Sequence, residues 1–201
     1  MELTVWTLPE GPVDEREVLR YAMMPAGSGD VAEPLRACIA MARGKAAGRA
    51  VSARFPVRRD GDLLDLGFAR TDSQALRKSL QGCDAVFLFA VTVGLELDRL
   101  IARCRHISPV YTLLLQALGA ERAESACDAL EQRLAAALEP GEILRPRFSP
   151  GYGDLPLSLQ KDVFRALDCE RRLGLTLTDS LLMVPSKSVT AIAGIASGAA
   201  V

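Results

Sequence analysis

The stretch Ala85-Val86-Phe87-Leu88-Phe89-Ala90-Val91-Thr92-Val93 is the longest apolar run of the chain. A short continuous run of this kind, rich in β-branched and aromatic residues, is typical of a strand that is covered on both faces of a sheet. It is too short to span a bilayer, which takes about 20 apolar residues in a helix. The run therefore predicts a fully buried central strand, around which the other elements are arranged.

Strand and helix patterns are interleaved on both sides of this strand. Residues 50–58 alternate between apolar and polar side chains, which predicts a half-buried strand, and Asp60-Gly61 signals a hairpin into residues 63–68. Ser108-Pro109 is a good helix start, and we expect one long helix from there to about residue 138.

Shorter patterns complete the predicted order of elements. We expect strands at 3–7, 142–148, 181–184 and 188–195, and helices at 14–23, 31–43, 71–82, 95–105 and 158–168, the last capped by Ser158. The Gly- and Ala-rich tail 193–201 is expected to fray. Interleaved strands and helices with a hairpin predict one α+β domain over residues 1–201, with a mixed or antiparallel sheet packed with helices.

The composition favours a globular protein and excludes some functions. Hydrophobic residues make up 49% of the 201 residues, and the net charge at pH 7 is −1. A charge this balanced leaves no basic face for a nucleic acid. The start of the chain lacks the basic and apolar regions of a signal peptide. We expect a cytoplasmic protein that binds neither nucleic acid nor membrane.

The cysteines and the histidine argue against a metal centre. The five cysteines are scattered without a C-x-x-C pair, and His106 is the sole histidine. Zinc and iron–sulfur sites need clustered ligands, so we expect none, and we expect the thiols to be buried, reduced packing residues. His106 follows a predicted helix and is expected to be a capping or surface residue.

The segment most informative about chemistry is Arg147-Phe148-Ser149-Pro150-Gly151-Tyr152-Gly153-Asp154. Arg147 offers a planar fork of donors that suits a carboxylate or a phosphate. Gly151 and Gly153 allow a sharp turn or the close approach of a ligand. Ordering such a loop costs entropy unless it packs or binds. The residues alone leave two interpretations open, a binding loop and a Pro-Gly turn with Arg147 in solvent.

This loop and the segment after it resemble the activation (reactivation) domain of cobalamin-dependent methionine synthase. That family carries an R-x-x-P-G-Y loop, a polar helix, an L-T-E/D-S segment and an M-x-P-x-x-S-V strand. The matching segments here are 147–152, 177–180 and 183–189. The run Thr92–Arg99 also matches the family's T-V-G-x-x-x-D-R, in which we expect Asp98 and Arg99 to tie a helix to the sheet. The likeness is strong over residues 85–195 and loose over 1–80. It is closest to short free-standing forms found beside split methionine synthases.

The resemblance implies a binding site for S-adenosylmethionine, with four residues as its candidates. Arg147 would meet the carboxylate of the ligand. Ser149, held extended before Pro150, would act mainly through its main chain, and Tyr152 would stack on adenine or face the sulfonium.

The fourth candidate, Glu124, lies in segment 119–128, which resembles the family's G-x-x-x-x-E helix. It takes the position of the family's ligand-binding glutamate. Its small apolar neighbours at helical spacing favour a partly buried face. From the residues alone, Glu124 could also be a solvated helix-surface carboxylate, and Glu121 and Asp128 are further candidates for the same role.

The resemblance also implies a function in methionine synthesis. The chain would be the reactivation subunit of a split enzyme and would present the methyl group of S-adenosylmethionine to cob(II)alamin on a partner protein. A flavodoxin- or ferredoxin-like donor would supply one electron. An alternative is a non-catalytic accessory module of a cobalamin-dependent or other corrinoid methyltransferase. Segment 14–21 supports this alternative, because it bears no clear likeness to the acidic and aromatic segment of longer family members.

Overall fold

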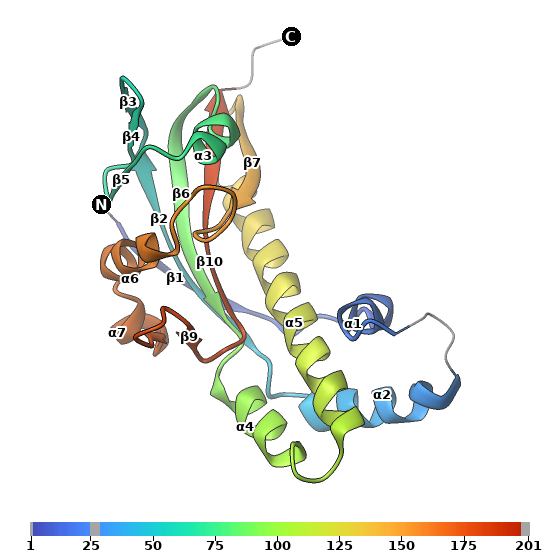
Figure 1. Cartoon of the computed structure of the whole chain (residues 1–201). Coiled ribbons are helices and arrows are strands. Elements are labelled where there is room, and N and C mark those ends of the chain that lie inside the picture. The colour runs from blue at the N-terminus through green and yellow to red at the C-terminus, as the bar shows by residue number, and fades with distance from the viewer. Residues whose placement is uncertain (1, 25–28, 198–201) are drawn as a thin grey trace.

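Five antiparallel strands form the main sheet of the computed structural model, which describes residues 2–24 and 29–197 (Figure 1). Their order across the sheet is β1-β2-β6-β10-β7, with the bounds Thr4–Leu8, Gly48–Pro56, Cys83–Thr92, Ser188–Ser197 and Glu142–Phe148. The predicted central strand is confirmed, because β6 is the middle strand of the five. The predicted α+β class with an antiparallel sheet is confirmed as well.

Successive side chains of β6 enter two different cores. Phe89 and Val91 pack on one face of the sheet, and Leu88 and Ala90 pack on the other. Because side chains alternate along a strand, a strand whose two sets are both apolar must be covered on both faces. Because both groups of apolar side chains must be buried, the sheet lies between two layers of helices.

The prediction of a half-buried strand at residues 50–58 is wrong for its middle. β2 has Ala50 in one core and Val51 in the other, and Ser52 between Val51 and Ala53 is only 2% exposed. The Ser52 hydroxyl accepts a hydrogen bond from Trp6 Nε1 of β1 at 2.9 Å, which satisfies its buried oxygen. The polar Ser52 made this face of β2 look exposed in the sequence, although its hydrogen bond to Trp6 allows it to be buried.

The helices divide between the two faces (Figure 1). The core that contains Phe89 is covered by α1 (Glu15–Tyr21), α2 (Gly29–Ala42), α4 (Leu95–Cys104) and α5 (Pro109–Ala136). The core that contains Leu88 is covered by α3 (Gln74–Ser79), α6 (Gln160–Leu167) and α7 (Cys169–Leu173). The remaining elements of the described residues are short strands and one 3₁₀ turn: β3 (Arg58–Asp60), β4 (Leu63–Asp65), β5 (Arg70–Thr71), η1 (Leu157–Leu159), β8 (Thr176–Leu177) and β9 (Met183–Val184).

The predicted long helix is confirmed as α5. Ser108 caps its N-terminus by accepting a hydrogen bond from the Tyr111 amide, and Pro109 occupies the first turn, where its missing N–H costs nothing. In Figure 1 the helix runs along the sheet toward β7. This course brings its C-terminal half beside the end of β7.

Two predictions about the C-terminal part are corrected. Ser158 does not cap a helix, because it lies inside η1, and α6 then begins without a side-chain cap. The tail does not fray over residues 193–197, because β10 continues to Ser197 with β6 and β7 paired on its two sides. Residues 198–201 of the predicted tail lie outside the described residues.

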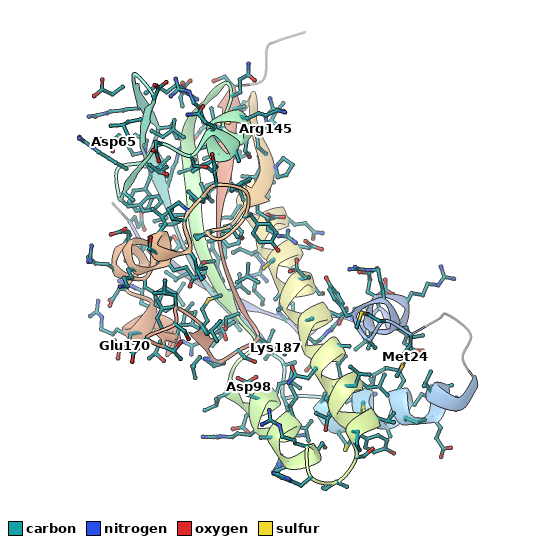
Figure 2. All side chains as sticks on the ribbon, viewed as in Figure 1. Met24, Asp65, Asp98, Arg145, Glu170 and Lys187 are labelled. Atoms are coloured by element: carbon teal, nitrogen blue, oxygen red, sulfur yellow. The ribbon has the colours of Figure 1, made fainter. Side chains whose placement is uncertain are left out.

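Asp98 ties a helix to the sheet, as predicted, but Arg99 does not. Asp98 accepts hydrogen bonds from the amide of Ser186 at 2.6 Å and from its hydroxyl at 2.7 Å, which ties α4 to the start of β10. Figure 2 places Asp98 and Lys187 together at this end of the molecule. Arg99 instead pairs with Glu96 on the surface of α4.

The five cysteines are buried free thiols, as predicted: Cys38, Cys83, Cys104, Cys127 and Cys169. Burial raises the pKa of Cys38 to about 11 and that of Cys169 to about 12, so these thiols stay protonated at neutral pH. Among the described residues, none of the helices combines the length and the apolar composition needed to cross a bilayer.

Gly194→Ala is expected to lower the free energy of unfolding by about 1–3 kcal/mol, because a Cβ there overpacks the core. The added atom would lie 2.6 Å from Cys83 Sγ and 2.9 Å from Leu80 Cδ2. Urea unfolding measures the change. Gly11→Ala is the control, since a Cβ at Gly11 meets nothing within 4 Å. Equal stability of the two variants would contradict the prediction.

Candidate functional site

A pocket opens where β7 ends and β10 continues without it. β7 pairs with β10 from Glu142↔Ser197 to Phe148↔Ile192, so residues 188–191 of β10 have β6 alone as a paired strand. The cavity at this open edge has a volume of about 430 Å³. Its lining residues are Glu124, Arg147, Phe148, Ser149, Pro150, Tyr152, Gln160, Met183, Ser188, Val189 and Thr190.

The chain leaves β7 in a tight loop that needs both of its glycines. Gly151 (φ 92°) and Gly153 (φ 56°) have backbone angles that side-chain-bearing residues rarely adopt. The loop closes on itself through a hydrogen bond from the Gly151 amide to the Leu155 carbonyl at 2.9 Å. A Cβ at Gly153 would lie 2.9 Å from Ala75 Cβ, so glycine also permits the close approach of the loop to α3.

Asp154 anchors the loop to the N-terminus of α3. Its carboxylate accepts hydrogen bonds from the Ser73 hydroxyl and from the amides of Gln74 (2.8 Å) and Ala75 (3.2 Å). The Ser73 hydroxyl, followed by the amide hydrogen bonds, holds the pKa of Asp154 below its usual range. An aspartate at the start of a helix also interacts favourably with the helix dipole. The loop is thus attached to β7 at one end and to α3 at the other.

Arg147 crosses from β7 to α5 and meets three carboxylates there. Its Nη2 donates to Glu124 Oε2 at 2.6 Å, and its Nη1 donates to Asp128 Oδ1 at 2.9 Å and to Glu131 Oε2 at 2.6 Å. The Arg147 side chain is 24% exposed. The three acidic residues lie on one face of α5, because positions spaced by three or four residues are neighbours on a helix.

Arg147 and Glu131 differ in what shifts their pKa values. Burial works against the charge of Arg147, but its hydrogen bonds with Glu124 and Asp128 outweigh burial and raise its pKa, so it stays protonated. Burial raises the pKa of Glu131, although Arg147 opposes the shift. Glu131 Oε1 is buried and has no hydrogen-bond partner among the described residues. The three carboxylates outnumber the one guanidinium, so this group beside the pocket has a negative net charge when all three are ionised.

The structure brings all four predicted site residues to this one pocket. Glu124 comes from α5, Arg147 from β7, and Ser149 and Tyr152 from the loop. Tyr152 is 69% exposed, so its ring is open to a molecule that approaches the loop. Asp128, an open candidate in the sequence, contacts Arg147 from the outer side and does not line the cavity.

Glu121 is not a surface carboxylate. It is buried beside Arg122, and the two form an ion pair away from the pocket. Arg122 also donates to the carbonyls of Gly11 (2.6 Å) and Pro12 (2.7 Å), and Glu121 accepts from the Asp14 amide at 3.2 Å. The pair therefore attaches the segment before α1 to the long helix. His106, as predicted, is exposed in the turn after α4.

Glu131 and Gln160 are among the polar residues at the site that were missed in the sequence. Glu131 lies about one helical turn beyond Asp128 and about two turns beyond Glu124, and its spacing could have placed it on their face. Gln160 lies on the buried side of α6, where a side-chain amide gives no sequence signal for binding. Among the described residues, no group of three or more His, Cys, Asp and Glu side chains is arranged to hold a metal ion.

Comparisons with known proteins relate the chain to one family. Residues 74–199 match the sequence model of the vitamin B12 dependent methionine synthase, activation domain. No curated protein matches the chain. Among solved structures, the chain is similar to the MetH reactivation domain bound to AdoHcy, with a TM-score of 0.71 and 18% sequence identity. That similarity covers 100% of this chain and 80% of the other, and at this identity it relates the folds.

Asp154→Asn is expected to lower the stability of the fold near neutral pH and to lose that effect in acid. Because the folded-state pKa of Asp154 is lowered, its carboxylate stabilises the fold above the ordinary aspartate pKa, and the stabilisation disappears as the pH falls through the lowered value. The test is urea unfolding of both proteins from about pH 6 to about pH 3.

Asp62→Asn is the control for this titration. Asp62 is exposed and has no hydrogen bond or ion pair to another described residue, so its substitution should leave stability nearly unchanged. A difference between wild type and Asp154→Asn that stayed constant across the pH range would contradict the role of the ionised carboxylate.

Proposed function

The chain belongs to the family of vitamin B12-dependent methionine synthase activation domains, and we propose that it binds S-adenosylmethionine in the pocket at the end of β7. One observation carries the proposal: Glu124, Arg147 and the 149–153 loop surround a single cavity at an open sheet edge. Its volume of about 430 Å³ is that of a small-molecule site. The AdoHcy bound to the solved MetH reactivation domain supports the choice of ligand.

The charges of the pocket suit the charges of this ligand. S-adenosylmethionine carries a carboxylate, an ammonium and a sulfonium, so its net charge is positive. The acidic residues that surround Arg147 favour a cationic ligand. Glu124 is 42% exposed and can accept hydrogen bonds from the ammonium group.

Arg147 retains donors for the carboxylate of the ligand. A guanidinium has five N–H groups, and hydrogen bonds to the three carboxylates of α5 use one N–H each. The remaining donors are available to the pocket that Arg147 lines. In this arrangement the carboxylates of α5 hold the guanidinium in place, and the ligand meets a side chain that is already ordered.

The loop would hold the nucleoside and the sulfonium. Ser149 precedes Pro150, which restricts it to an extended conformation and so directs its main-chain groups. The exposed ring of Tyr152 can stack on adenine or face the positive sulfur. The glycines on both sides of Tyr152 set the position of this ring.

The proposed activity is to present a methyl group to a cobalamin that a separate methionine synthase subunit carries. In this reaction the partner's cob(II)alamin accepts one electron from a donor such as a flavodoxin or ferredoxin. It then takes the methyl group, and S-adenosylhomocysteine is left in the pocket. The transfer depends on alignment of sulfur, methyl carbon and cobalt, so the contribution of this chain is positioning.

A second candidate is an accessory module that binds a cobalamin-dependent or other corrinoid methyltransferase without using the cofactor. The observation that favours it is the pairing of Arg147 with three carboxylates, which would make the guanidinium a purely structural group. Calorimetry with S-adenosylmethionine, alone and with the cobalamin-carrying subunit, separates the two. Binding in either mixture supports the cofactor role, and no binding in both supports the accessory module.

Arg147→Ala is expected to weaken S-adenosylhomocysteine binding by about 1–3 kcal/mol, the cost of losing a charged hydrogen-bond pair. Isothermal titration calorimetry measures the affinity, and circular dichroism checks that the variant is folded. Arg145→Ala is the matched control, because Arg145 belongs to the same strand but lies toward α3, outside the pocket (Figure 2). Equal affinity of folded Arg147→Ala and wild type would refute the proposed site.

A further inference from the structure

Gln160 is a polar residue at a position where the helix pattern calls for an apolar one. The buried side of α6 consists of Gln160, Val163 and Leu167, at the spacing of one helical face. Val163 and Leu167 pack in the core between α6 and the sheet. Gln160 is only 6% exposed and continues the same face toward the pocket.

The side-chain amide oxygen of Gln160 is not satisfied by the described residues. Its Oε1 is buried and has no hydrogen-bond partner among the described residues. Burial of an amide oxygen without a partner costs free energy, and such groups are rare in folded proteins. A methionine or leucine would fill the same position without this cost. The packing of α6 therefore does not explain why residue 160 is a glutamine.

The pocket has a charged side and an uncharged side. Glu124 and Arg147 belong to α5 and β7, and α5 covers one face of the sheet. Gln160 belongs to α6, which covers the other face, and it lines the pocket together with Ser188 and Thr190 of β10. The Ser188 hydroxyl already bonds Thr92 Oγ1 and the Pro185 carbonyl. Gln160 differs from Ser188 on this side, because its buried Oε1 has no hydrogen-bond partner among the described residues.

The two sides match the two halves of the proposed ligand. The amino-acid half carries the charges and suits Glu124 and Arg147, so the uncharged nucleoside half is left to face Gln160. A side-chain amide presents an acceptor and a donor side by side. Adenine presents the complementary pair, its 6-amino group and N7, and glutamine commonly pairs with this edge.

We propose that Gln160 recognises the adenine base, with Oε1 accepting from the 6-amino group and Nε2 donating to N7. The inference rests on the proposed function and adds a specificity-determining residue to it. Since Oε1 makes no hydrogen bond with another described residue, its pairing with a ligand breaks none. Gln160 thereby selects a 6-amino purine over a 6-oxo purine, whose O6 and N7 are both acceptors.

The test compares wild type with Gln160→Met, which keeps the length of the side chain and removes the amide. Two ligands are used in calorimetry, S-adenosylhomocysteine and S-inosylhomocysteine, in which an oxo group replaces the 6-amino group. Wild type is expected to prefer the adenosyl ligand by about 10-fold or more. Gln160→Met should lose most of this preference through weaker binding of the adenosyl ligand. Gln132→Met, an exposed change on α5, should keep it.

The thermal midpoint without ligand gives a second readout that a structural role would move in the opposite direction. Replacement of an unsatisfied amide by an apolar side chain should leave the midpoint unchanged or raise it. A lowered midpoint would mean that the amide supports the fold, and this outcome overturns the proposal. If Gln160→Met does not fold, Gln160→Glu decides, since an ionised carboxylate keeps the shape but cannot donate to N7.

The outcomes separate this inference from the proposed function. If wild type binds neither ligand, alone or with the cobalamin-carrying subunit, the proposed function fails. If wild type binds the adenosyl ligand and Gln160→Met keeps the full preference over the inosyl ligand, the cofactor role stands and the role of Gln160 is overturned.

Discussion

The site depends on a mismatch in length between two neighbouring strands. β10 begins at Ser188, but β7 accompanies it only as far as Phe148 beside Ile192. The first residues of β10 therefore have an open edge, and a strand edge without a partner exposes groups that other elements or ligands can cover. Pro150 and the glycines after it turn the chain away from the sheet at this point. A longer β7 would fill the space that is now the pocket.

The loop that leaves β7 is held from both sides of the sheet. Arg147 attaches its start to α5 through three carboxylates, and Asp154 attaches its end to α3 through the helix N-terminus. These two helices cover opposite faces, so the loop passes across the edge of the sheet from one face to the other. Residues between two anchors lose less freedom when a ligand binds, because much of the ordering cost is met during folding. This arrangement suits the methyl-positioning role that we propose for the chain.

Buried polar atoms without partners occur in the pocket and beside it. Among the described residues, the buried side-chain atoms that lack a hydrogen-bond partner are Glu131 Oε1, Gln160 Oε1 and Arg172 Nε. Glu131 contacts Arg147, and Gln160 lines the cavity, so two of these atoms belong to the site. Natural proteins accept such local costs mainly at functional sites. The pattern agrees with a pocket whose hydrogen bonds are completed by a ligand.

The sequence by itself determined the elements whose signal is local. The apolar run 85–93 predicted β6, Ser108-Pro109 predicted the start of α5, and the glycines around Tyr152 predicted a tight loop. It also carried the family, because R-x-x-P-G-Y and M-x-P-x-x-S-V are compact motifs with a fixed spacing. Tertiary structure alone decided which charges meet: Arg147 with Glu131, Glu121 with Arg122, and Asp154 with the start of α3. These pairings depend on how α5 and α3 lie against the sheet, and that placement comes from long-range packing of apolar faces, which no local pattern specifies.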